Sequence, residues 1–177
     1  YHTFDERKLK ELKLASAKAI FFLGGEGEEK KYLVSKKKHS KKCSGKDKKW
    51  EFPGGKIDKK EKTLPALERE LKEEDTSQIL HKTLQKLSKE NSNQVKYKIV
   101  KLKDKTLHAI FLLPLKRTYW RALENFYKQN KTTNLETYGF LTISEGNLVE
   151  AEGHESLWTP KSLKILKALR KDKTISK

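Results

Sequence analysis

The stretch Arg69-Glu-Leu-Lys-Glu-Glu74 carries more information than any other part of this sequence. It lies in a segment whose leucines recur every three or four residues, and this spacing predicts a helix over residues 63–74. Three carboxylates of the predicted helix stand at i, i+3 and i+4 and therefore share one face: Glu70, Glu73 and Glu74.

Like charges at these spacings repel each other, so a helix selected for stability alone would avoid them. Hard divalent cations such as Mg²⁺ and Mn²⁺ bind clustered carboxylate oxygens and would relieve the repulsion. A solvated, glutamate-rich helix face is the alternative interpretation of the same spacing.

Residues before the helix extend the pattern at fixed distances. Gly55 is followed after five residues by Glu61, and Glu61 after seven residues by Arg69. Together with the helix, this run resembles the Nudix box, the signature of the Nudix hydrolase family. The family pattern ends in a glycine and an apolar residue, for which this sequence has Thr76 and Ser77. Threonine resists the left-handed backbone that glycine permits, so we expect a local adjustment at the helix exit rather than a loss of catalysis.

The resemblance implies the family's fold, an α/β (layered α+β) domain in which a mixed sheet is sandwiched between helices. Apolar patterning indicates the same alternation of strands and helices, with a short N-terminal helix over residues 5–14. We expect one domain over residues 1–177, with a helical extension at 1–15 and a basic tail at 171–177. The remaining predicted helices are 78–90, 120–129 and 160–170, and the predicted strands are 17–23, 32–34, 50–55, 97–100, 106–115 and 138–143.

The resemblance also implies a role for each matching position. The Gly55 carbonyl and the carboxylates of Glu70 and Glu74 would hold Mg²⁺ or Mn²⁺, and Glu73 would be a further ligand or the catalytic base. Glu61 would support this cluster, and Arg69 would orient and neutralise the glutamates, because a planar guanidinium suits two carboxylates.

A second acidic segment spans residues 145–155 and contains no lysine or arginine. Many family members take a further metal ligand or base from a late loop, and Glu150 or Glu152 would fill this role here. We name Glu152 as the candidate. An acidic loop without a chemical role is the alternative, and His154 is either a surface residue or a substrate contact.

The formal net charge of +17, from 41 lysines and arginines against 24 acids, predicts a polyanionic partner. The densest part is the lysine tract at residues 36–49, which is either a polyanion-binding loop or a solvated one. Four lysines of the tract are candidate substrate-binding residues: Lys37, Lys38, Lys41 and Lys42. Four aromatic residues either stack a base or belong to the core: Trp50, Tyr119, Trp120 and Tyr138.

These features predict a metal-dependent Nudix pyrophosphohydrolase that cleaves a diphosphate linkage. The charge favours capped or 5′-polyphosphorylated RNA, as in mRNA decapping. Diphosphoinositol polyphosphates are the next candidate, and nucleoside triphosphates the third, because residues 50–57 look like the entry strand of the nucleotide-sanitising branch. A catalytically weak RNA- or partner-binding module is the alternative from another class.

One cysteine excludes an internal disulfide framework and favours a reducing compartment, the cytoplasm or nucleus, reached directly or after secretion. No apolar run approaches the roughly 20 residues of a membrane span.

Overall fold

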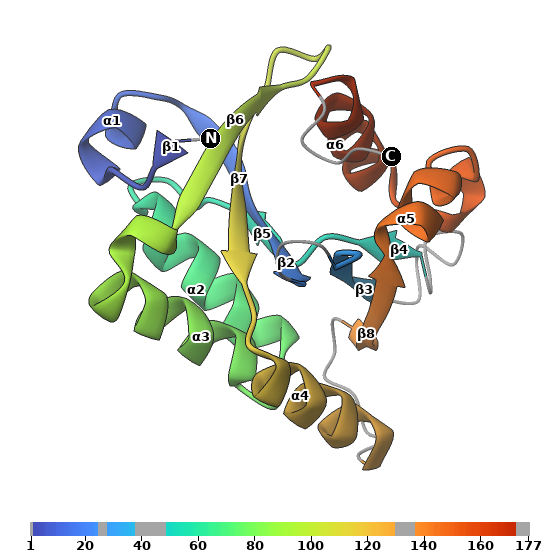
Figure 1. Cartoon of the computed structure of the whole chain (residues 1–177). Coiled ribbons are helices and arrows are strands. Elements are labelled where there is room, and N and C mark those ends of the chain that lie inside the picture. Colours follow the sequence, from blue (N-terminus) through green and yellow to red (C-terminus); the bar gives the residue numbers. More distant parts are fainter. Residues whose placement is uncertain (1, 25–27, 38–48, 130–136, 173–177) are drawn as a thin grey trace. The chain divides into compact units, whose positions relative to one another are not determined.

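The computed structural model describes residues 2–24, 28–37, 49–129 and 137–172 (Figure 1). These residues form six α-helices and eight strands. The chain divides into two compact units: unit 1 comprises residues 1–21 and 53–115, and unit 2 comprises residues 22–52 and 116–177.

The strands of unit 1 are ordered β1 (His2–Thr3), β6 (Lys96–Lys101), β7 (Leu107–Pro114) and β2 (Leu14–Leu23). A further strand, β5 (Gly54–Lys56), runs antiparallel to β2. Six consecutive residues of β2 are buried, so both faces of this strand are covered. β5 is therefore placed against a rigid, fully packed strand.

Unit 1 has three α-helices: α1 (Glu6–Lys10), α2 (Thr63–Glu74) and α3 (Ile79–Glu90). α2 and α3 pack side by side (Figure 1). α2 buries Leu67 and Leu71, whose i, i+4 spacing forms its apolar face. A carboxylate of α1 caps its start, because the Thr63 N–H donates to Glu6 Oε1 at 3.0 Å. α2 is thus fixed at its first turn and along its apolar face.

Unit 2 is built on β3 (Lys31–Lys37), which pairs antiparallel with β8 (Thr137–Ser144) and with β4 (Trp50–Glu51). Its helices are α4 (Arg117–Gln129), α5 (Glu145–Ala151) and α6 (Pro160–Lys171). Trp50 also forms a parallel bridge with Trp158. Parallel and antiparallel pairings occur together, and the predicted α/β class with a mixed sheet is confirmed.

The structure corrects three predicted elements. The first helix is shorter than residues 5–14, because β2 already begins at Leu14. The strand expected over residues 50–55 is two strands, interrupted at Pro53, which has no N–H to donate.

The acidic segment expected to be a loop begins with α5 (Glu145–Ala151). Ser144 caps this helix by accepting from the Asn147 N–H at 3.3 Å, and Leu148 and Ala151 are buried beneath it. Seven residues are too few for apolar periodicity to reveal a helix.

No helix in the described part of the chain has both the length and the apolar character that crossing a membrane requires. The expectation of one domain over residues 1–177 stays a prediction, and the end of the basic tail, residues 173–177, lies outside the described residues.

Candidate active site

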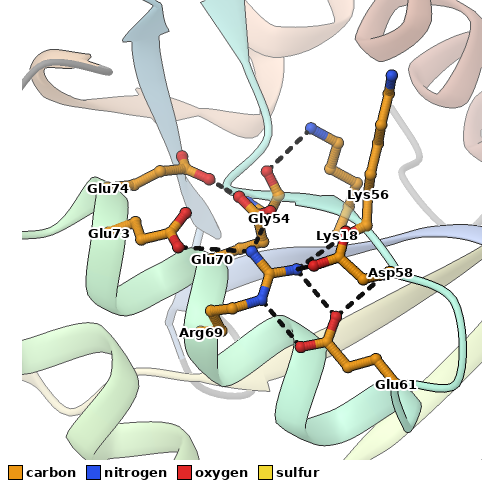
Figure 2. A network of polar contacts seen from close by, with 9 residues as sticks. All are labelled: Lys18, Gly54, Lys56, Asp58, Glu61, Arg69, Glu70, Glu73 and Glu74. Atoms are coloured by element: carbon orange, nitrogen blue, oxygen red, sulfur yellow. Dashed lines mark hydrogen bonds and ion pairs between the residues drawn. The ribbon is translucent and has the colours of Figure 1, made fainter.

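Arg69 gathers four carboxylates of unit 1 around one guanidinium (Figure 2). Its Nε and Nη2 donate to the two oxygens of Glu61, each at 2.9 Å, in a bidentate pair. Its Nη1 donates to Glu70 Oε1 at 2.9 Å and to Glu73 Oε1 at 3.5 Å. Asp58 adds a fourth carboxylate at 3.5 Å. The structure therefore brings together four of the predicted site residues, and their roles in catalysis stay predictions.

The two glycines that precede the loop to α2 approach the remaining carboxylates. The Gly54 N–H donates to Glu74 Oε1 at 2.9 Å. A Cβ on Gly55 would lie 2.4 Å from the carboxyl carbon of Glu70. The absence of a side chain at Gly55 thus creates the space that the Glu70 carboxylate occupies, and the strand and the helix form one oxygen-lined site.

The pairing of β5 with β2 distinguishes the two glycines. The Ala19 N–H donates to the Pro53 carbonyl at 2.8 Å, and the Ile57 N–H donates to the Ala15 carbonyl at 3.1 Å. Alternate residues of an antiparallel strand direct their polar groups toward the partner, so Gly55 faces β2 and Gly54 faces away from it. The Gly55 carbonyl therefore faces β2, and its predicted role as the backbone ligand for a cation stays a prediction.

Lys18 on β2 also reaches this site, although the sequence analysis did not single it out. Its side chain is buried, and its Nζ donates to the Gly54 carbonyl oxygen at 3.3 Å. Burial raises the pKa of Glu70, and the charge of Lys18 is a minor effect that opposes this rise. A single lysine inside an otherwise apolar strand was the available signal, because a buried ammonium requires polar partners.

The carboxylates of the site differ in their electrostatics. Burial raises the pKa of Glu70, and the guanidinium of Arg69 only partly opposes this effect. The hydrogen bond from Arg69 lowers the pKa of Glu61 below its ordinary value. The same bond raises the pKa of Arg69, which remains charged throughout the accessible range. The site consequently holds one strongly paired glutamate and one desolvated glutamate that a cation would stabilise.

The donor chemistry fits a hard divalent cation. All the side chains that meet at Gly54 and Gly55 from α2 offer carboxylate oxygens, and the space at Gly55 is shaped around one of them. In the described part of the chain, no group of three or more Asp, Glu, His or Cys side chains is arranged to hold a metal ion. Arg69 draws Glu70 and Glu73 toward Glu61, so these glutamates would turn from Arg69 to bind a cation.

Asp75 stabilises the turn at the exit of α2, where Thr76 stands in place of the family's glycine. Its fully buried carboxylate accepts from the Ser77 N–H at 3.0 Å, from the Ser77 hydroxyl at 2.5 Å and from the Leu80 N–H at 2.9 Å. The left-handed residue of this turn is Gln78, with φ of 64°, rather than Thr76. The turn therefore forms without glycine, which is the local adjustment expected from the sequence.

The acidic segment of unit 2 shows a different arrangement. Glu152 pairs with Arg170 at 3.1 Å, Glu155 with Lys167 at 3.2 Å, and Glu145 accepts from the Tyr32 hydroxyl at 3.5 Å. Glu152, the named catalytic candidate, is thus held by an arginine of α6.

The predicted lysine contacts fall outside the description. Lys38, Lys41 and Lys42 are not among the described residues, nor is the side chain of Lys37. Four lysines at the end of β5 and in the loop that leads to α2 are, however, exposed, and the sequence analysis did not single them out. They are Lys56, Lys59, Lys60 and Lys62.

The structure describes the surroundings of two further side chains, those of Trp120 and His108. Trp120 is buried, and its Nε1 donates to Glu124 Oε1 at 3.0 Å and to Thr142 Oγ1 at 2.8 Å, so it belongs to the core. His108 is fully buried, with its Nδ1 2.6 Å from Ser16 Oγ. The side chain of Tyr138 is not described.

Several solved structures are similar to this chain, and the first of the three described here supports the fold. A MutT/Nudix family protein from Listeria innocua matches with a TM-score of 0.52 and 16% identity, covering 90% of this chain and 92% of that one. An Enterococcus faecalis MutT/Nudix family protein matches at TM-score 0.47 and 13% identity, over 75% of this chain and 44% of that one. A C. elegans Ap4A hydrolase matches at TM-score 0.43 and 14% identity, over 80% and 92% of the two chains.

Comparison with curated protein sequences gives no match. The family model described as NUDIX domain matches residues 13–119, which is more than half of the 177 residues. This segment contains the complete carboxylate cluster of unit 1. The chain therefore belongs to the Nudix family and is a hydrolase of phosphoric anhydride bonds.

Proposed function

We propose that this Nudix pyrophosphohydrolase acts on capped or 5′-polyphosphorylated RNA with the help of Mg²⁺ or Mn²⁺. The observation that supports the proposal is that one strand–loop–helix segment carries both the carboxylate cluster and four exposed lysines. The carboxylates suit a cation, and the lysines offset the repulsion between those carboxylates and the phosphates of a substrate.

Glu70, Glu73, Glu74 and a glycine carbonyl of the β5 turn would hold the cation. When bound, such a cation neutralises charge on the phosphate oxygens and lowers the pKa of an attacking water. Glu74 is fixed by the Gly54 N–H, and the desolvated Glu70, once turned from Arg69, would gain a counter-charge from the cation. These two residues therefore account for binding rather than for proton transfer.

Glu73 is the best-placed proton acceptor of the cluster. Its side chain is 46% exposed, against 15% for Glu70, and its contact with Arg69 is longer, at 3.5 Å. Hydrolysis joins a water oxygen to one phosphorus atom, breaks the bond from that phosphorus to the bridging oxygen, and releases a proton. Glu73 would take this proton, while Arg69 keeps the neighbouring carboxylates charged and oriented.

The net charge of the chain supports a long substrate rather than a short one. A small dinucleotide needs only a few cationic contacts, whereas a net charge of +17 suits a polyanion that extends beyond the scissile phosphates. The lysine tract at residues 36–49 is the proposed contact for those further phosphates, with Lys37, Lys38, Lys41 and Lys42 as its binding residues.

Salt dependence of KM tests this proposal. Each lysine–phosphate contact to a single strand contributes a slope of about −0.7 in log K against log salt. Replacing the four tract lysines by glutamine should flatten the slope for capped RNA by up to about 3. Hydrolysis of a cap dinucleotide should stay within about twofold of wild type, because the carboxylate cluster is untouched. The matched control replaces four exposed lysines of unit 1: Lys82, Lys89, Lys101 and Lys103.

An equal response to the tract variant on both substrates, or none on either, would overturn the extended-RNA proposal. A higher KM on diphosphoinositol polyphosphates or on nucleoside triphosphates would then identify the compact substrate. The control variant separates a specific contact from a general loss of positive charge.

A further inference from the structure

A pocket of about 380 Å³ lies in unit 2, between β8, α5 and Trp50 of β4. This volume is within the range of small-molecule sites, roughly 300–1,000 Å³. Apolar side chains form part of its wall, among them Ile143 and Leu157. Leu157 is one of the few large apolar side chains that are exposed in the described structure.

Trp50 is held in a fixed orientation at one wall of the pocket. Its ring lies 5.5 Å from that of Trp158 at 82°, an edge-to-face contact. The Thr159 N–H donates to the Trp50 carbonyl at 3.0 Å, which fixes the backbone. Trp158 in turn donates its Nε1 proton to the Ala151 carbonyl at 2.9 Å, so the end of α5 is tied to the same pair of rings. Trp50 is thus a rigid, partly exposed aromatic platform.

Three polar side chains line the pocket and make no hydrogen bond or ion pair within the described residues: Asn147, Glu150 and His154. Asn147 and Glu150 stand at i and i+3 on α5 and so face the same side. The other three acids of residues 145–155 have partners, at Tyr32, Arg170 and Lys167. Among these four acids of the described segment, Glu150 has the unpaired carboxylate, and its exposed side chain lines the pocket.

The charge of the lining defines the ligand class. None of the described residues that line this pocket is a lysine or an arginine, although the chain carries 41 of them. A site for phosphate would contain them. An aromatic platform next to a carboxylate instead suits a planar base, which stacks on the ring and donates its edge protons.

We propose that this pocket binds a guanine base, with Trp50 as the stacking platform and Glu150 as the acceptor of the adjacent N1–H and N2–H protons. Adenine presents one donor and one acceptor on that edge and pairs poorly with a carboxylate. Methylation at N7 gives the base a positive charge, which strengthens stacking on tryptophan and attraction to Glu150. The proposal is argued from residues of unit 2 alone and does not depend on the proposed RNA substrate.

Calorimetric titration with nucleosides tests the proposal without phosphate or metal. Guanosine and 7-methylguanosine should bind at least tenfold more tightly than adenosine, with the methylated nucleoside tighter of the two. Glu150→Gln should weaken guanosine binding by tenfold or more, because a charge-assisted pair of hydrogen bonds is lost. Trp50→Phe keeps an aromatic ring and should weaken all nucleosides together.

Glu155→Gln is the matched control, since it removes one charge from the same acidic segment at a residue outside the pocket. It should leave guanosine affinity within about twofold of wild type. No binding of guanosine, equal binding of guanosine and adenosine, or an unchanged affinity in Glu150→Gln would each overturn the proposal. Because the titration contains no diphosphate, its failure is independent of any failure of the RNA hydrolysis assay.

Discussion

The two acidic clusters of this protein are built on opposite plans. In unit 1, one guanidinium binds several carboxylates, and Arg69 lies within 3.5 Å of Glu61, Glu70 and Glu73. In unit 2, Glu152 and Glu155 each have a cation of their own, from α6. Shared pairing keeps several negative charges close together, whereas separate pairing neutralises them one by one.

This difference indicates which cluster is suited to a cation. A shared arginine can release one glutamate and keep its bond to another, so the carboxylates of unit 1 are available together. The carboxylates of Glu152 and Glu155 are individually satisfied, and only Glu150 is left for a ligand. We therefore propose that diphosphate cleavage takes place at the carboxylate cluster of unit 1.

The largest expected effect is on catalysis by the shared cluster. Glu73→Gln and Glu74→Gln should each lower kcat by roughly 100-fold or more, the scale of a lost base or electrostatic contact. Glu74 is buried and accepts from Gly54, and glutamine retains an acceptor oxygen there, so the fold should survive. Steady-state kinetics measures kcat, and circular dichroism checks that each variant keeps the fold. Glu68→Gln is the control, because Glu68 lies on the same helix and interacts with Gln85 of α3.

Alanine at each of the two glycines separates folding from catalysis. Gly54 has φ of 125°, and a Cβ there would lie 2.2 Å from the Ala17 carbonyl oxygen, so Gly54→Ala should cost about 3 kcal/mol or more in unfolding free energy. At Gly55 the obstacle is the flexible end of Glu70. Gly55→Ala should cost under about 1 kcal/mol yet lower kcat by tenfold or more. Equal stability losses in the two variants would contradict this geometry.

Arg69→Lys tests whether the fork of the guanidinium holds the cluster. We expect the free energy of unfolding to fall by about 1–2 kcal/mol at pH 7, because lysine cannot pair bidentately with Glu61. The effect stays this small because partial exposure to solvent weakens the ion pairs of the cluster. The hydrogen bond from Arg69 lowers the pKa of Glu61 from 4.5. Its stabilisation is therefore complete above pH 4.5 and is lost as the pH falls through the lowered pKa. Urea unfolding should show wild type and variant converging in acid; a constant gap down to pH 2 would contradict the pairing.

The smallest effect is expected in the separately paired cluster. Glu152→Gln removes one partly exposed ion pair with Arg170 and should cost about 0.2–1 kcal/mol in thermal unfolding. The same variant decides the catalytic role that was proposed for Glu152. A tenfold or larger loss of kcat would support that role, and unchanged kinetics would show that the residue is structural.

The sequence predicted the cluster of unit 1 because its geometry is local. The spacing of Glu70, Glu73 and Glu74 fixes their common face as soon as a helix forms, and α2 has the predicted bounds, Thr63–Glu74. Arg69 precedes Glu70 directly and stands four residues before Glu73, so their contacts follow from the same helix. The resemblance to the family pattern then led us to expect metal binding and hydrolysis at these positions.

Only the tertiary structure decided the contacts between distant segments. Lys18 reaches Gly54 because β2 and β5 pair in one particular register, and the strand alternation that turns the Gly54 carbonyl toward the site depends on that register. The partners of Glu152 and Glu155 lie 18 and 12 residues away on α6, so local spacing could not show which acids of this segment are paired and that Glu150, which lines the pocket with Trp50, is not. Local spacing determines which groups share a helix face, whereas packing between elements determines which of them are left for a ligand.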